Sequence, residues 1–419
     1  IKANKVFLEM EKISMESIIP EYFNKDFFKC ALASCLHEED VEILSLQLEK
    51  PKSGGENYCS NIYRTQVKYK CKSRTEDIFM IIKSLPEQKQ GALKRLNIFN
   101  KETIFYLDIK PKLETLMWHA KTTWELGARH IFSTTQPEQT IILEDLSQHG
   151  FILRSRQMGL DEKDAIVVIK KIAQYHALTM VMADRSTIVD KFEHGLLNKN
   201  SIHAPAFKAL FGAQLLKVAE ISADWPGFED ISTKLFHYHG NFTEMVMKSV
   251  YPLMGVLNVL NHGDLWINNL LFRNDEANLQ SEVRFIDFQL CFYGSVGFDL
   301  NYFFNTSLQL DVLQNRKEAL LQIYSEVLGD TLKRLPCHIN PPSLNIIKQE
   351  LKAREGYGFF VAFGLLPLMA MDSLDSRDNN LENFHDSDFA GKKIELMFKK
   401  NGRAINTLQF IIKELDIFK

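Results

Sequence analysis

The feature that most constrains this chain is a pair of short segments in its second half. Residues 260–272 read L-N-H-G-D-L-W-I-N-N-L-L-F, and residues 283–289 read V-R-F-I-D-F-Q. The first segment places Asp264 ahead of Asn269, and the second ends an apolar, β-like run at Asp287. A carboxylate can take a proton from a hydroxyl group, and amide and carboxylate oxygens are ligands for Mg²⁺. This order of side chains predicts a site for phosphoryl transfer.

The strength of this signal comes from the whole pattern. H-G-D alone is weak, whereas H-G-D-x-x-x-x-N followed by an apolar strand ending in Asp is specific. The alternative interpretation is a polar turn followed by a capped strand. We expect His262 to brace the backbone of the loop rather than to transfer protons.

Two alternating segments near the N-terminus, 41–50 and 61–70, predict a β-hairpin. The sequence P-K-S-G-G-E-N-Y-C-S lies between them. Gly54 and Gly55 would let the backbone approach phosphate groups closely, because glycine has no side chain. The turn differs from G-x-G-x-x-G, so an ordinary hairpin is the alternative for this segment taken alone.

The next apolar run, D-I-F-M-I-I-K, predicts a buried strand that ends at Lys83. An ammonium group there could reach nucleotide phosphates, and a surface lysine closing a strand is the alternative. Residues 98–119 predict a helix that places one set of side chains on one face: Ile98, Glu102, Phe105, Tyr106 and Ile109. Glu102 is the candidate partner of Lys83. Pro111 is expected to end or kink this helix.

The run T-I-I-L-E-D-L-S-Q-H-G-F at 140–151 predicts a strand that breaks into polar residues. In a kinase, a hinge between two lobes would fall here. The backbone groups of Glu144, Asp145 and Leu146 would then pair with adenine. We therefore predict a nucleotide-binding lobe at 1–146 and a catalytic and substrate-binding lobe at 147–419.

The motifs G-G-E-N-Y, L-E-D-L, H-G-D-L-W-I-N-N, I-D-F-Q and G-F-D-L, with Lys83 and Glu102, resemble the ecdysteroid kinase-like family. This family, also called CHK kinase-like, is found mainly in insects and is related to choline kinases and aminoglycoside phosphotransferases. The resemblance extends over most of the chain. It implies an α/β (α+β), two-lobed, protein-kinase-like fold, with an antiparallel sheet plus a helix in the N-lobe and a larger, mainly helical C-lobe.

The resemblance also implies ATP and Mg²⁺ as cofactors and a hydroxyl group of a small molecule as phosphoryl acceptor. By position, Asp264 would be the catalytic base, and Asn269 and Asp287 would be metal ligands. Lys83 and Glu102 would align the phosphates. The best-known substrates of such enzymes are steroid hormones of the ecdysone type, so we expect an apolar acceptor, either such a steroid or a xenobiotic.

Three alternatives stay open. A choline or aminoglycoside kinase would share the motifs, whereas a protein kinase would carry H-R-D, D-F-G and A-P-E. A catalytically silent protein that binds steroids or plant toxins would have no use for the intact Asp264, Asn269 and Asp287. Under the family resemblance, Asp299 in G-F-D-L would brace the catalytic loop.

Composition agrees with an intracellular enzyme. The net charge of −3, without a long basic block, argues against nucleic acid or an anionic membrane as partner. The six cysteines lack C-x-x-C spacing, which indicates reduced thiols rather than disulfides or a zinc site. The charged start I-K-A-N-K-V-F-L-E-M-E-K is unlike a secretory signal, so a cytoplasmic location is expected. The sequence does not indicate the oligomeric state.

The C-terminal half predicts mainly helices, starting with one capped by Asp161, in which His176 would be a satisfied core residue. The expected helical ranges are 161–183, 203–221, 228–258, 297–330, 341–371 and 390–413. The apolar stretch 358–371 is shorter than the ~20 residues that span a bilayer. We expect it to form a buried helix that could line the acceptor site. The polar segment 372–388 is expected to be a solvated loop.

Overall fold

The computed structural model divides the chain into two compact units. Residues 1–94 and 128–148 form the first unit, and residues 95–127 and 149–419 form the second. Gly54, Gly55 and the polar segment 372–388 lie outside the described residues. The structure describes the following residues: 19–49, 60–85, 98–121, 125–185, 187–193, 195, 197, 200, 204–250, 257–275, 280–371, 393, 395–398 and 402–415.

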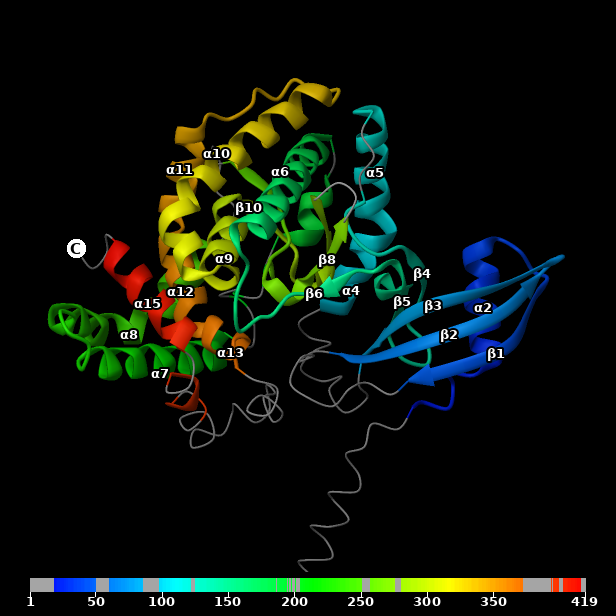
Figure 1. Ribbon diagram of the computed structural model, residues 1–419, viewed down its shortest axis with the longest axis horizontal. Coiled ribbons are helices and arrows are strands. Elements are labelled where there is room, and N and C mark those ends of the chain that lie inside the picture. Colours follow the sequence, from blue (N-terminus) through cyan, green and yellow to red (C-terminus); the bar gives the residue numbers. More distant parts are fainter. Residues whose placement is uncertain are drawn as a thin grey trace, which may run out of the picture. The chain divides into compact units, whose positions relative to one another are not determined.

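The first unit is built on an antiparallel sheet with the strand order β1-β2-β3-β5-β4 (Figure 1). Its strands are β1 (Val41–Glu49), β2 (Asn61–Cys71), β3 (Arg74–Ser84), β4 (His130–Thr134) and β5 (Thr140–Glu144). Strands β1 and β2 confirm the predicted hairpin. Strand β3 confirms the buried strand predicted to end at Lys83, and β5 confirms the strand predicted before the hinge.

One helix, α2 (Lys25–Leu36), packs against this sheet. The Asn24 side chain accepts a hydrogen bond from the Phe27 backbone N–H at the start of α2. Along β2, alternate side chains from Tyr63 to Tyr69 are buried because successive residues of a strand point to opposite faces. Phe28 and the other apolar residues on the buried face of α2 complete this core. Sequence analysis had not identified α2.

The predicted helix at 98–119 belongs to the second unit rather than to the first. Its Phe105 ring stacks on Phe288, with 3.8 Å between ring centroids. The segment consists of α4 (Ile98–Ile104), a π-helical turn η2 (Phe105–Ile109) and α5 (Lys110–His119). Pro111 therefore does not end the helix. It follows a wider turn in which the Lys110 N–H bonds to the Phe105 carbonyl, a local irregularity of the kind found near proline.

The second unit is mainly helical, and Figure 1 shows α7 and α8 side by side. Its other helices are α6 (Glu162–Arg185), α7 (Ala204–Ser222), α8 (Glu229–Ser249), α9 (Gly297–Ser307), α10 (Leu310–Arg334), α11 (Leu344–Ala353), α12 (Glu355–Gly364), α13 (Leu366–Met369) and α15 (Gly402–Glu414). Its short strands are β6 (Ile152–Leu153), β7 (Asn258–Asn261), β8 (Leu270–Asp275), β9 (Gln280–Phe285) and β10 (Phe292–Ser295). The predicted mixed α/β class, with an antiparallel sheet and a larger helical part, is confirmed. The functional boundary near residue 146 stays a prediction.

Three predicted helical ranges were wrong in detail. Asn258 begins β7, which pairs with β10, instead of ending a helix. The range 297–330 contains two helices, because Leu160 pairs with the chain around Leu308 and interrupts the helical hydrogen bonds there. The range 341–371 contains α11, α12 and α13.

The apolar stretch 358–371 is mostly buried, as expected, but it spans the end of α12 and the short helix α13 instead of one helix. In α12, Phe360 packs edge to face on Phe211 of α7, and Phe359 packs on Phe242 of α8. Among the described residues, the stretch long and apolar enough to cross a bilayer is Glu162–Met182 in α6, and 78% of it is buried. Core helices of folded proteins meet the same criteria, so this stretch is weak evidence for a membrane span.

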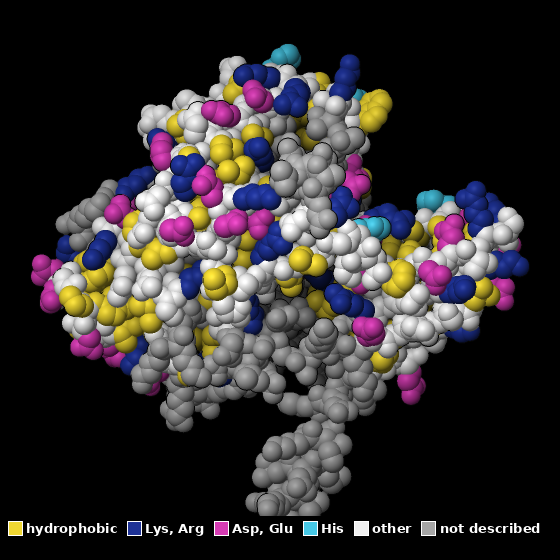
Figure 2. Space-filling view, in the orientation of Figure 1, with side chains coloured by type: hydrophobic (Ala, Val, Ile, Leu, Met, Phe, Trp, Pro, Cys, Tyr) yellow, Lys and Arg dark blue, Asp and Glu magenta, His cyan; other side chains and the backbone are white. Residues whose placement is uncertain are grey.

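Charged side chains of both signs are interspersed on the surface. Figure 2 shows Lys and Arg lying among Asp and Glu over the described part of the face in view. This arrangement agrees with the small net charge of −3.

Helix α9 is buried along its whole length and is tied to its neighbours by asparagine side chains. The Asn301 amide donates hydrogen bonds to the carbonyls of Leu351 (3.0 Å) and Arg354 (3.3 Å), and the Asn305 amide donates to the Gly358 carbonyl (2.9 Å). At the start of the helix, a Cβ atom on Gly297 would lie 2.5 Å from the Glu350 carbonyl oxygen. Glycine is therefore required for α9 to approach α11.

Replacing this glycine tests that packing. Gly297→Ala should lower the free energy of unfolding by about 1–3 kcal/mol, because the added methyl group overlaps a backbone oxygen. Gly240→Ala in α8 is the matched control, since a Cβ there would meet no atom within 4 Å. That control should raise stability by about 0.5–1 kcal/mol. Urea unfolding followed by circular dichroism measures both changes, and equal stability of the two variants would contradict the packing account.

Candidate active site

The H-G-D segment forms a tight loop between β7 and the 3₁₀ turn η5 (Ile267–Asn269). Gly263 has φ 80°, in the left-handed region that side chains disfavour. A Cβ atom there would lie only 2.1 Å from the Leu290 carbonyl oxygen. Glycine is thus required both by the backbone conformation and by the close approach of the following segment.

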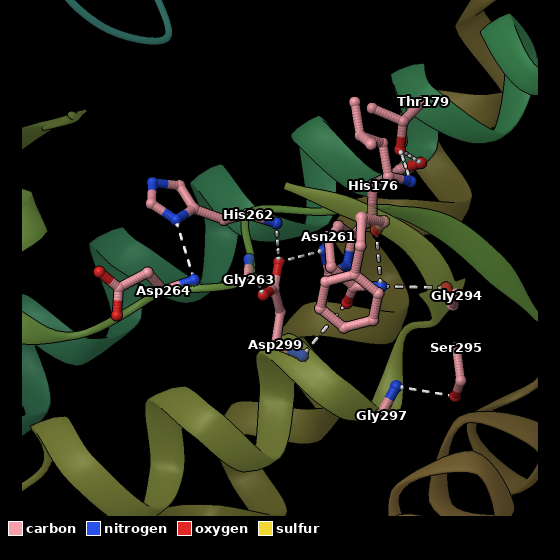
Figure 3. Close-up of polar contacts among 12 residues, drawn as sticks. His176, Thr179, Asn261, His262, Gly263, Asp264, Gly294, Ser295, Gly297 and Asp299 are labelled. Carbon is pink, nitrogen blue, oxygen red and sulfur yellow. Dashed lines mark hydrogen bonds and ion pairs between the residues drawn. The ribbon is translucent and has the colours of Figure 1, made fainter. Parts of the chain in front are cut away.

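The side chain of Asp299 holds this loop by binding backbone N–H groups of the loop. Its carboxylate accepts hydrogen bonds from the His262 N–H at 2.7 Å and the Gly263 N–H at 3.0 Å. In return, the Asp299 N–H donates to the Asn261 side-chain oxygen at 3.2 Å. Figure 3 shows the Asp299 carboxylate directed at these N–H groups, whereas the Asp264 side chain points away from Asp299. The expected bracing role of Asp299 is confirmed.

A buried histidine orients the Asp299 carboxylate. His176 on α6 is fully buried, and its Nε2 lies 3.1 Å from Asp299 Oδ2. Its Nδ1 lies 2.8 Å from the Tyr324 hydroxyl. A tautomer protonated at Nε2 satisfies both contacts, with Tyr324 as donor to Nδ1. His176 is the satisfied core residue that we expected, and it also fixes the brace.

His262 joins the H-G-D loop to the segment that carries Asp287. Its Nε2 is 3.0 Å from the Ile286 carbonyl oxygen, and its Nδ1 accepts from the Asp264 N–H at 3.4 Å. One tautomer, protonated at Nε2, again satisfies both contacts. The predicted bracing role of His262 agrees with this geometry.

Both carboxylate oxygens of Asp264 accept hydrogen bonds from neighbouring side chains. The Asn269 amide donates to Oδ2 at 2.9 Å and also to the Asp264 backbone oxygen at 2.8 Å. The Tyr302 hydroxyl donates to Oδ1 at 2.6 Å. Sequence analysis missed Tyr302. Its position three residues after Asp299 on one helix was the available signal, since residues at that spacing share a face.

Asp287 follows β9 in a conformation that is uncommon for a residue other than glycine. It has φ 69° and ψ 61°, in the left-handed region, where a side chain adds strain. The Gln289 amide donates to its carboxylate at 3.3 Å. The Ile286 N–H donates to the Asn269 backbone oxygen at 3.0 Å and so brings the two predicted metal ligands into neighbouring segments.

The donor set fits a hard divalent cation. The side-chain nitrogen of Asn269 donates hydrogen bonds to Asp264, so the side-chain oxygen of Asn269 is the atom that could bind a metal. Asp287 adds a carboxylate, and Mg²⁺ prefers such oxygen ligands. The assignment of both residues as ligands stays a prediction.

Lys83 and Glu102 lie in different units, and their pairing stays a prediction. Lys83 is buried near the end of β3, opposite Ile62 and Ile141 in the sheet. Glu102 is buried in α4 of the second unit.

Lys101, the residue before Glu102, anchors α4. Its ammonium group donates to the Cys291 carbonyl at 3.1 Å, and burial lowers the pKa of Lys101 to about 8. Helix α4 is thereby fixed against the segment that follows Asp287.

The predicted hinge residues lie where β5 ends. The N–H of Glu144 donates to the Arg129 carbonyl at 2.9 Å, and the N–H of Asp145 donates to the Phe79 carbonyl at 3.0 Å. The Asp145 carboxylate accepts from the Ser147 N–H at 3.0 Å and so caps the turn η3 (Leu146–His149). Two of the three backbone N–H groups are therefore used within the first unit. Their predicted contact with adenine is untested.

Comparison with solved structures finds distant similarities to small-molecule kinases. The chain shares 12% identity with an ethanolamine kinase of Plasmodium vivax, covering 94% of each chain with a TM-score of 0.41. It shares 12% identity with an amicoumacin kinase bound to AMP-PNP and Ca²⁺, covering 90% of each chain (TM-score 0.38). An aminoglycoside phosphotransferase bound to ADP and hygromycin B is 9% identical over 90% of this chain and 98% of its own (TM-score 0.31).

Among curated proteins, no significant sequence match was found. At 9–12% identity and TM-scores of 0.31–0.41, the solved structures are too distant to assign the chain to a family. The assignment rests on the family model. The model of the ecdysteroid kinase-like family matches residues 54–337, which is more than half of the chain and includes both segments of the candidate site. The chain belongs to the ecdysteroid kinase-like family.

Proposed function

We propose that this protein transfers the γ-phosphoryl group of ATP to a hydroxyl group of a small, apolar molecule. The acceptor class would be ecdysteroids or related steroids and xenobiotics. The observation that carries the proposal is the arrangement around Asp264. A carboxylate held by two donors sits in a loop that Asp299 braces and that His262 ties to the Asp287 segment. Membership of the family supports the same chemistry.

In the proposed reaction, the acceptor hydroxyl oxygen attacks the γ-phosphorus of ATP. The bond between that phosphorus and the bridging oxygen of ADP breaks, and Asp264 takes the proton of the hydroxyl group. Asn269 and Asp287 would hold Mg²⁺, which neutralises charge on the phosphates. Lys83 would contact the α and β phosphates, and Glu102 would orient its ammonium group.

The apolar acceptor is proposed on family membership. The aromatic rings beside Tyr302, those of Tyr357 and Phe298, are buried in the core of the second unit. Apolar contact would contribute about 25 cal/mol per Å² of acceptor surface buried. A few polar groups would then suffice to place one hydroxyl beside Asp264.

A panel experiment tests the proposed function. Hydroxylated steroids, plant metabolites, choline and an aminoglycoside are each incubated with the protein, ATP and Mg²⁺, and mass spectrometry reads the addition of phosphate. We expect phosphorylation of a steroid or another apolar alcohol. Transfer to choline or the aminoglycoside alone would overturn the apolar acceptor. Steroid binding without any transfer would identify a binding protein instead.

Removing the proposed base tests the role of Asp264. Asp264→Asn keeps the size of the side chain but removes its basicity, so kcat should fall by about 10²- to 10⁴-fold. Nucleotide affinity should stay close to that of the wild type, because Asp264 is assigned to the acceptor. Steady-state kinetics and titration with a fluorescent ATP analogue measure the two effects. Turnover near the wild-type value would exclude Asp264 as the base.

Variants of the two proposed ligands test the metal site. Asp287→Ala removes a charged ligand and Asn269→Ala a neutral one, so the first should weaken Mg²⁺-dependent ATP binding more strongly. Asn269→Ala should also lower kcat, because Asn269 donates to the Asp264 carboxylate. Mg²⁺ titrations of ATP binding compare the variants. A wild-type response in both would place the cation elsewhere.

A further inference from the structure

Helix α9 contacts the Asp264 loop with two side chains, those of Asp299 and Tyr302. Asp299 holds the backbone N–H groups of His262 and Gly263. Tyr302, three residues later on the same face, reaches the carboxylate of Asp264 itself. One rigid element thus fixes both the path of the loop and the end of its acidic side chain.

The contact of Tyr302 with Asp264 has the features of a strong hydrogen bond. The oxygen–oxygen distance is 2.6 Å, within the range for a hydroxyl group that donates to a carboxylate. Tyr302 is only 3% exposed, so water competes little for the hydroxyl. Burial and then the charge of Asp264 raise the pKa of Tyr302 well above its usual value, which keeps the phenol protonated as a donor.

Tyr302 and Asn269 hold opposite oxygens of the same carboxylate. Asn269 donates to Oδ2 and Tyr302 to Oδ1, so rotation of the carboxylate about its terminal bond would break both hydrogen bonds. These two donors occupy two of the roughly four lone-pair sites of the carboxylate, one on each oxygen. The base would be oriented before the acceptor arrives.

The position of Tyr302 is itself fixed by its surroundings. Asn301 and Asn305 tie α9 to the carbonyls of Leu351, Arg354 and Gly358. The other titratable groups that act on Tyr302 are Tyr357 on α12 and Asp299 on α9.

We propose that Tyr302 is a positioning residue that orients the Asp264 carboxylate. This inference rests on the proposed function, in which Asp264 is the base. Tyr302 acts only through Asp264. Its loss should therefore change the chemical step and leave binding of ATP intact.

The test compares Tyr302→Phe with wild type. Losing a hydrogen bond to a charged group should lower kcat by about 10- to 100-fold with an unchanged KM for ATP. Tyr357→Phe is the matched control, since it removes a hydroxyl from a neighbouring buried ring. Its kcat should match that of the wild type.

A second measurement needs no acceptor. The signal of the Asp264 carboxyl carbon is followed by NMR at one pH and is assigned by its absence in Asp264→Asn. Its chemical shift should change in Tyr302→Phe and should stay at the wild-type value in Tyr357→Phe. An unchanged shift or an unchanged kcat in Tyr302→Phe would overturn the positioning role. If the shift changes but the wild type phosphorylates no acceptor, the hydrogen bond is confirmed and the proposed function fails.

Discussion

The candidate site depends on one buried carboxylate, Asp299, which accepts hydrogen bonds from two consecutive backbone N–H groups. Such groups cost free energy when they are buried without partners, so the His262–Gly263 turn is stable only with an acceptor beneath it. His176 orients that acceptor through Nε2 and is itself held by Tyr324. This chain of contacts joins α6, α9 and α10 to the loop that presents Asp264.

The same region explains how the two sequence segments act together. His262 bonds to Ile286, and Ile286 bonds back to Asn269, so the loop with Asp264 and the segment with Asp287 share hydrogen bonds. The π-helical turn η2 packs against the segment after Asp287, where Phe105 stacks on Phe288. A site for phosphoryl transfer works mainly by holding groups in place, and this network supplies such a support.

Sequence patterns predicted the parts that depend on local chemistry. Alternation predicted β1 and β2, apolar runs predicted β3 and β5, and the H-G-D pattern predicted the loop that contains Gly263. The parts that were missed depend on tertiary contacts. The helix at 98–119 groups with the second unit through the Phe105–Phe288 stack, and Leu160 divides the range 297–330 by pairing near Leu308. Tyr302 was overlooked although it lies three residues after Asp299 on the same helix, because that spacing alone does not show that its hydroxyl group reaches Asp264.

The central claim is that Asp299 holds the Asp264 loop in the geometry needed for transfer. Hydrogen exchange of the His262 and Gly263 amides in Asp299→Asn tests it most directly. The asparagine side chain would present its NH₂ group to one of two N–H donors and so lose one of the two hydrogen bonds. We predict that the amide left without an acceptor exchanges at least about tenfold faster than in wild type, while amides in β2 and β3 of the first unit keep their rates. Unchanged exchange at His262 and Gly263 would contradict the claim.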